Sequence, residues 1–190
     1  MASLPCQDRY INMHTENEIK ILDIDVAAAE QKLLDLGFTH TEDLSYRRFV
    51  YDTAPARKSA WIRLRTDGTT TTLTFKESTQ DSVDGVKEIE IVVDDFDVTN
   101  ELLKAAGHAP RGYQENKRTN YEGMGCVISI DSWPLIPPYM EIEAPTAEAV
   151  NACLEQLADL VKTSTTSLPT GDVYRQYGID LDSMQDLRFK

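Results

Sequence analysis

The chain has 190 residues, 41% of them hydrophobic and 27% charged, which is the composition of an ordinary globular protein with a substantial core. Its net charge of -13 at pH 7 argues against a nucleic-acid backbone or an anionic membrane as partner, because like charges repel. No run of about 18 apolar residues predicts a membrane helix, and residues 1–13 lack the apolar core of a signal peptide, so we expect a cytoplasmic protein.

The first half of the chain predicts strands with one early helix. Residues 16–21 alternate charged side chains with mostly apolar ones, which is the period of a β-strand. Asp25 is expected to cap a helix over 26–36, and Gly37 ends that run. The Asp67-Gly68 pair is a strong hairpin signal. Further strands are predicted at 46–51, 61–66, 70–76 and 86–93.

The second half follows a similar order. Extended segments are predicted at 110–121, 126–131 and 139–144, and helices at 98–106, 146–161 and 172–177. Each half ends in an acidic strand followed by a helix, Glu88-Ile89-Glu90 in one and Glu141-Ile142-Glu143 in the other. Either an internal duplication or chance would produce this likeness.

Charged side chains on these strands are sorted by sign. Acidic or basic residues share one strand face at Glu16, Glu18 and Lys20, at Arg63 and Arg65, at Glu88 and Glu90, and at Glu141 and Glu143. For any single strand, the solvent face of a half-buried sheet explains the pattern. If all these faces point into a closed barrel, however, the charges must neutralise one another or a ligand. Arginine and lysine suit phosphate oxygens, and carboxylates suit hard divalent cations.

At these residues the sequence resembles the CYTH family, the triphosphate tunnel metalloenzymes. The family motif ExExK stands here as Glu16-Asn17-Glu18-Ile19-Lys20. The later motifs follow in the order of the family, as WIRLRTDG (61–68), LTFKE (73–77), KEIEI (87–91), ENKRTNYE (115–122) and ISIDSWPLIPPYMEIE (128–143). The segment VYRQYGIDL (173–181) resembles the end of bacterial class IV adenylate cyclase-like members.

The resemblance implies an α+β fold, in which an eight-stranded antiparallel β-barrel forms a tunnel and helices pack outside it. It implies a single CYTH domain, which we expect over 13–182, between a flexible tail at 1–12 and a C-terminal tail at 183–190. It also implies dependence on Mg²⁺ or Mn²⁺. Family members include inorganic triphosphatases, thiamine triphosphatases, class IV adenylate cyclases and RNA triphosphatases.

Site residues carry over from the family position by position. The basic residues that match triphosphate-binding positions are Lys20, Arg63, Arg65, Lys76 and Arg118. The acids that match metal-site positions are Glu16, Glu18, Asp131, Glu141 and Glu143, with Asp131 the weaker metal candidate. Glu88 and Glu90 match acids that act in catalysis by orienting basic side chains or a metal-bound water.

One strand departs from the family pattern of Lys-x-Arg. The chain has Asn116-Lys117-Arg118, so if Arg118 points inward, Lys117 points outward and Asn116 takes the lysine position. Of Arg47 and Arg48, only one can face the tunnel for the same reason.

Three functions remain open from the sequence. The favoured one is metal-dependent hydrolysis of a small triphosphate, namely tripolyphosphate, a nucleoside triphosphate such as ATP, or thiamine triphosphate. The second is an adenylate cyclase that forms cyclic AMP and pyrophosphate from ATP. The third is a non-catalytic triphosphate or polyphosphate binder. We expect neither a nucleic-acid nor a membrane partner, and a homodimer is possible.

Overall fold

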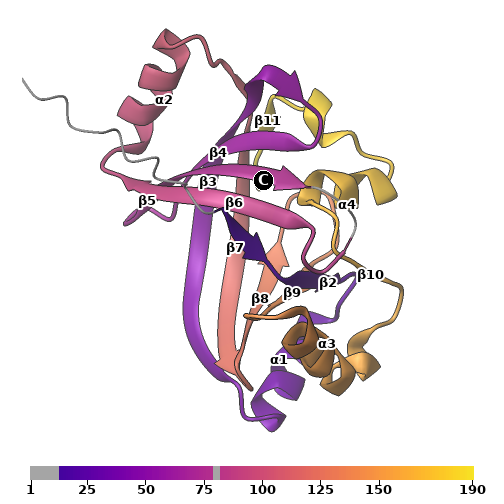
Figure 1. Cartoon of the computed structure of the whole chain (residues 1–190). Coiled ribbons are helices and arrows are strands. Elements are labelled where there is room, and N and C mark those ends of the chain that lie inside the picture. Colours follow the sequence, from indigo (N-terminus) through magenta and orange to yellow (C-terminus); the bar gives the residue numbers. More distant parts are fainter. Residues whose placement is uncertain (1–12, 79–81) are drawn as a thin grey trace, which may run out of the picture.

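One strongly curved sheet of eleven strands forms the body of the part that the structure describes, residues 13–78 and 82–190 of this computed structural model (Figure 1). The strands are β1 (His14–Glu16), β2 (Glu18–Ile21), β3 (Thr39–Arg57), β4 (Ala60–Thr66), β5 (Thr71–Ser78), β6 (Val86–Val93), β7 (Pro110–Gly123), β8 (Cys126–Ser132), β9 (Tyr139–Glu143), β10 (Thr165–Thr166) and β11 (Asp186–Leu187). The tail predicted at 1–12 lies outside the described residues.

Hydrogen-bonded pairing runs round a ring, because one N-terminal segment joins both ends of the sheet. The pairing order is β1-β6-β5-β4-β3-β7-β8-β9-β2, and only Asn17 separates β1 from β2 in the chain. With β1 and β2 counted as one strand, β3 to β9 complete a ring of eight antiparallel strands. The predicted α+β barrel is therefore confirmed, and the strand count differs because its first strand is split and two short strands are added.

The two short strands β10 and β11 are not part of this ring of eight. β10 pairs antiparallel with β2, and β11 pairs parallel with β7. Residues 183–190, which the sequence sets apart as a tail, thus include a strand, and Leu187 within it is buried.

The helices α1 and α3 begin at the caps that the sequence indicates. The side chain of Asp25 accepts a hydrogen bond from the Ala28 amide, and Thr146 accepts one from Ala149. The second helix starts before the predicted residue 98, because Asp95 caps it. The helices are α1 (Val26–Asp35), α2 (Phe96–Ala105), α3 (Ala147–Gln156) and α4 (Thr170–Gln176), with 3₁₀ turns η1 (Ala158–Leu160) and η2 (Leu181–Ser183). No helix among the described residues has the length and apolar character needed to cross a membrane.

The main apolar core lies outside the ring, between the sheet and the helices. α1 and α3 cover the outer face near β2, β8 and β9 (Figure 1), where Leu33 and Val150 meet Ile21 and Ile142. A second cluster joins α4 and the C-terminal segment to Trp133 and other residues, and a third lies beneath α2. Because strand side chains alternate, packing Ile21 and Ile142 outward turns their charged neighbours inward.

Candidate functional site

A cavity of about 400 Å³ lies inside the ring and collects the predicted site residues. Of those residues the cavity is lined by Glu16, Glu18, Lys20, Arg63, Arg65, Lys76, Glu88, Glu90, Arg118, Glu141 and Glu143. Asp131 is fully buried behind this lining, where it contacts Arg118. The alternation of charged and apolar residues on each strand therefore brings together side chains that are far apart in the sequence.

Acidic residues dominate the wall formed by β2 and β9. In the antiparallel register, Glu18 lies opposite Glu143 and Lys20 lies opposite Glu141. The Lys20 Nζ atom is 2.6 Å from Glu18 Oε1 and 3.4 Å from Glu141 Oε1. Burial opposes the charge of Lys20, but Glu18 and Glu141 raise its pKa above the ordinary value. Lys20 thus neutralises part of this wall.

A second lysine neutralises the neighbouring acids. The Lys76 Nζ atom lies 2.7 Å from both carboxylate oxygens of Glu16 and 3.3 Å from Glu88 Oε2. No group of three or more carboxylate, histidine or cysteine side chains within residues 13–78 and 82–190 is arranged as a ready metal site. Instead, Lys20 contacts the carboxylate of Glu18, and Lys76 contacts that of Glu16.

Glu143 is the acid of this wall without a basic partner in the described part of the chain. Burial first, and then the neighbouring carboxylates of Glu16, Glu18 and Glu141, raise its pKa to about 7. Like charges directly opposite each other on neighbouring strands are unfavourable, as Glu18 and Glu143 are here. Oxygen donors with an uncompensated negative charge fit a hard divalent cation.

Basic residues dominate the wall formed by β3 and β4. Arg48 lies opposite Arg65 in the register of these strands. No carboxylate within the described residues pairs with Arg65, whose guanidinium instead lies 4.4 Å from the Tyr46 ring centroid. Burial first, and then Arg63, lowers the pKa of Arg65 to about 10. This wall therefore carries a positive charge that the protein leaves uncompensated.

Arg63 is the member of this wall with an acidic partner. Its Nη2 atom lies 3.3 Å from Glu90 Oε2 and donates to Thr74 Oγ1 at 3.3 Å. The Thr74 hydroxyl in turn donates to Glu90 at 2.6 Å. Glu90 and Thr74 thus fix the position of Arg63.

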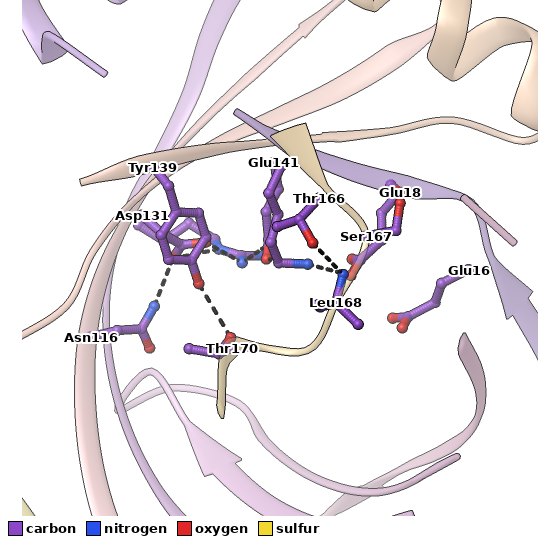
Figure 2. Close-up of polar contacts among 12 residues, drawn as sticks. Glu16, Glu18, Asn116, Asp131, Tyr139, Glu141, Thr166, Ser167, Leu168 and Thr170 are labelled. Atoms are coloured by element: carbon purple, nitrogen blue, oxygen red, sulfur yellow. Dashed lines mark hydrogen bonds and ion pairs between the residues drawn. The ribbon is translucent and has the colours of Figure 1, made fainter. Parts of the chain in front are cut away.

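Arg118 on β7 is tied to the acids of the next two strands. Its Nε and Nη2 atoms lie 3.1 Å and 2.5 Å from the two carboxylate oxygens of Asp131, and Nη2 also contacts Glu141. Asn116 is 1% exposed and donates to Asp131 at 2.7 Å (Figure 2). Lys117 points away from the cavity and lies over the Phe189 ring. Arg118 and Asn116 together occupy both carboxylate oxygens of Asp131. This arrangement favours a role for Asp131 in positioning Arg118 rather than in binding a metal.

The family model of the CYTH domain matches residues 14–170. The chain belongs to the CYTH family. The tunnel that the resemblance implies corresponds to the charged cavity inside the ring.

Solved structures share this CYTH fold at low sequence identity. A candidate adenylate cyclase from Vibrio parahaemolyticus matches with a TM-score of 0.71 and 13% identity, covering 86% of this chain and 99% of that one. A protein from Pyrococcus horikoshii OT3 matches with a TM-score of 0.69 and 21% identity, over 85% and 99%. An adenylyl cyclase candidate from Hippeastrum, described as having dominant triphosphatase activity, matches with a TM-score of 0.59 and 20% identity, over 84% and 96%. No curated protein matches the chain.

Several lining residues of this CYTH cavity were not among the predicted site. Arg48 points inward, and its guanidinium lies 4.5 Å from the Trp133 ring centroid. The hydroxyl of Tyr139 lies 3.2 Å from that of Thr170 in α4 (Figure 2). Tyr139 has the same strand parity as Glu141 and Glu143, so the alternation could have identified it. The contribution of Trp133 and α4 depends on tertiary packing and has no such signal.

Proposed function

We propose that this CYTH protein hydrolyses a small triphosphate with the help of a divalent metal ion. One observation carries the proposal: a cross-strand pair of arginines and a cross-strand pair of glutamates face the same cavity. Arg48 and Arg65 form one pair on β3 and β4, and Glu18 and Glu143 form the other on β2 and β9. In the ring order, the two pairs lie on opposite sides of the barrel.

The basic wall fits the phosphoryl oxygens of the substrate. Arginine offers several N–H donors in a planar fork, and these bonds are strengthened by charge. Arg63 and Arg65, together with Lys20, Lys76 and Arg118, are the proposed triphosphate ligands. Glu90 holds Arg63 and Glu88 contacts Lys76, so we assign these two acids to catalysis by orienting the basic side chains. Phosphoryl transfer needs such positioning and charge neutralisation more than a covalent intermediate.

The acidic wall fits the metal that the family implies, Mg²⁺ or Mn²⁺. Glu16, Glu18 and Glu143 are its proposed ligands, with Glu141 beside them, whereas Asp131 serves Arg118. The bound cation would neutralise charge on the phosphoryl group. A small triphosphate in the cytoplasm is the substrate we propose, and a homodimer stays a prediction.

The test is a substrate panel in which two products are measured. Purified protein is incubated with tripolyphosphate, ATP or thiamine triphosphate in the presence of Mg²⁺ or Mn²⁺, and orthophosphate and cyclic AMP are both quantified. We expect metal-dependent orthophosphate release, which chelation with EDTA abolishes. Tight binding without any turnover would contradict hydrolysis and leave the binding function.

Cyclic AMP formation from ATP is the main competing outcome. The structural likeness to cyclase candidates concerns the fold, and the Hippeastrum protein is described as mainly a triphosphatase. Cyclic AMP as the dominant product, with pyrophosphate in equal amount, would replace our proposal with the cyclase.

A further inference from the structure

Arg48 is a buried cation that the protein does not neutralise. Its residue is 8% exposed, and no described carboxylate lies within ion-pair distance. The Arg48 Nη2 atom donates instead to the neutral Oδ1 atom of Asn116. Asn116 uses its own amide nitrogen for Asp131. A buried charge held only by a neutral amide is costly unless a ligand compensates it.

Two buried N–H groups at this position have no acceptor among the residues that the structure describes. They are Arg48 Nε and Trp133 Nε1, and Trp133 is 5% exposed. Both residues line the cavity, and the Arg48 guanidinium stacks on the Trp133 ring. Arginine and the indole of tryptophan can only donate hydrogen bonds. A ligand on the cavity side of this guanidinium must therefore present acceptor oxygens, and the positive charge favours an anion.

The position of Asn116 explains why this cation is available. Asn116 lies opposite Tyr46 on β3, and Gln114 lies opposite Arg48, so Arg48 and Asn116 are inward-facing neighbours on adjacent strands. A lysine at residue 116 would compete for Asp131 and repel Arg48. With an asparagine there, Arg48 can occupy this part of the tunnel.

We propose that Arg48 and Trp133 form an oxyanion subsite for one phosphoryl group of the substrate, with Asn116 as the residue that positions Arg48. Residue 116 on β7 is an asparagine and carries no charge. In the proposed subsite, Arg48 on β3 supplies the cation instead. This inference rests on the proposed triphosphate-binding function. It adds a binding residue and an aromatic support that are not among the site residues predicted from the sequence.

Binding without turnover tests the subsite. The affinity for tripolyphosphate is measured by isothermal titration calorimetry in EDTA, for the wild type, Arg48→Gln and Arg47→Gln. We expect Arg48→Gln to bind at least about tenfold more weakly, the usual effect of losing a charged hydrogen bond. Arg47 is the matched control, because its outward side chain contacts Phe96 and Asp97. Equal weakening of both variants, or of neither, would overturn the subsite.

A rescue variant separates loss of charge from loss of structure. The variant Arg48→Lys keeps the positive charge at this position, and we expect it to bind tripolyphosphate more tightly than Arg48→Gln. If Arg48→Gln weakens binding but the folded Arg48→Lys variant, checked by circular dichroism, binds no better, Arg48 acts structurally and the proposal fails.

Trp133 provides an independent signal. Of the two tryptophans in the chain, Trp61 can be replaced by phenylalanine, so that emission reports on Trp133. Tripolyphosphate should change this emission, and Arg48→Gln in the Trp61→Phe background should remove the change. An emission that never responds to bound tripolyphosphate contradicts the subsite alone. Failure of the wild type to bind tripolyphosphate overturns both this inference and the proposed function.

Discussion

The two charged walls of the tunnel are compensated to different degrees. On the acidic side, Lys20 and Lys76 lie among the carboxylates, and Glu143 is the acid left without a cation in the part of the chain that the structure describes. On the basic side, Glu90 pairs with Arg63, while Arg48 and Arg65 lack a carboxylate partner in the described residues. Paired charges should therefore contribute to stability as well as to ligand binding, whereas unpaired ones should contribute to ligand binding alone. Substitutions on either side can break or sharpen this comparison.

The largest effect is expected at the paired cation Arg118. Arg118→Gln leaves Asp131, which is fully buried, without its bidentate partner. Removing one member of a buried ion pair costs about 3–5 kcal/mol of stability. Urea denaturation monitored by circular dichroism measures this loss. A change in the free energy of unfolding below about 1 kcal/mol would show that the pair is not structural.

Arg65 should behave in the opposite way. Arg65→Gln should raise the KM for tripolyphosphate by at least about tenfold, because a charged hydrogen bond to the ligand is lost. Its stability without ligand should be unchanged or higher, because repulsion from Arg48 and Arg63 is relieved. Kinetics and urea denaturation on the same preparation test both parts. A marked loss of stability with normal KM would reverse the assignment.

Glu143 gives the corresponding test on the acidic side. Without metal, Glu143→Gln should stabilise the protein by roughly 0.2–1 kcal/mol, the scale of a like-charge cross-strand pair. With Mg²⁺ or Mn²⁺, turnover should fall, because a proposed ligand is lost. Stability unchanged or lowered in EDTA would argue that Glu143 is already compensated.

The same residue predicts a dependence on pH. A carboxyl whose pKa is raised by folding stabilises the native state below its unfolded pKa, and this contribution disappears as pH rises to the folded pKa. For Glu143 the loss should run from about 4.5 to about 7. In EDTA, the advantage of Glu143→Gln over the wild type should therefore grow across this interval. An advantage that is constant with pH would contradict the raised pKa.

The smallest effect is expected at an exposed pair outside both walls. Lys104 lies 2.8 Å from Glu101 on the surface of α2. Lys104→Ala should change the free energy of unfolding by less than about 0.5 kcal/mol and leave KM unchanged. Thermal denaturation and kinetics check this baseline. A larger effect on KM would mean that charge far from the tunnel also governs binding.

The strand alternation predicted most of the tunnel, but not its pairing. Glu18, Lys20, Arg63 and Arg65 could be placed on inward faces because each strand face is either charged or apolar. Whether Arg47 or Arg48 faces inward depends on the register of β3, which no local pattern in that strand specifies.

Long-range contacts explain the other differences. β3 extends well beyond the predicted 46–51, because its residues pair along β7 as well as β4. Asp131 matches an acidic position of the family, and the sequence makes it the weaker metal candidate. Its engagement with Arg118 follows from cross-strand register, since the two residues are direct partners.

The central claim is that the metal and the phosphoryl groups bind to opposite walls of the tunnel. The most direct test is a crystal structure with tripolyphosphate and Mn²⁺, in which anomalous scattering locates the metal. The account predicts a manganese peak beside Glu18 and Glu143 and phosphoryl oxygens on Arg63 and Arg65. Tripolyphosphate or manganese bound outside the tunnel, with its interior charges paired only to one another, would contradict it.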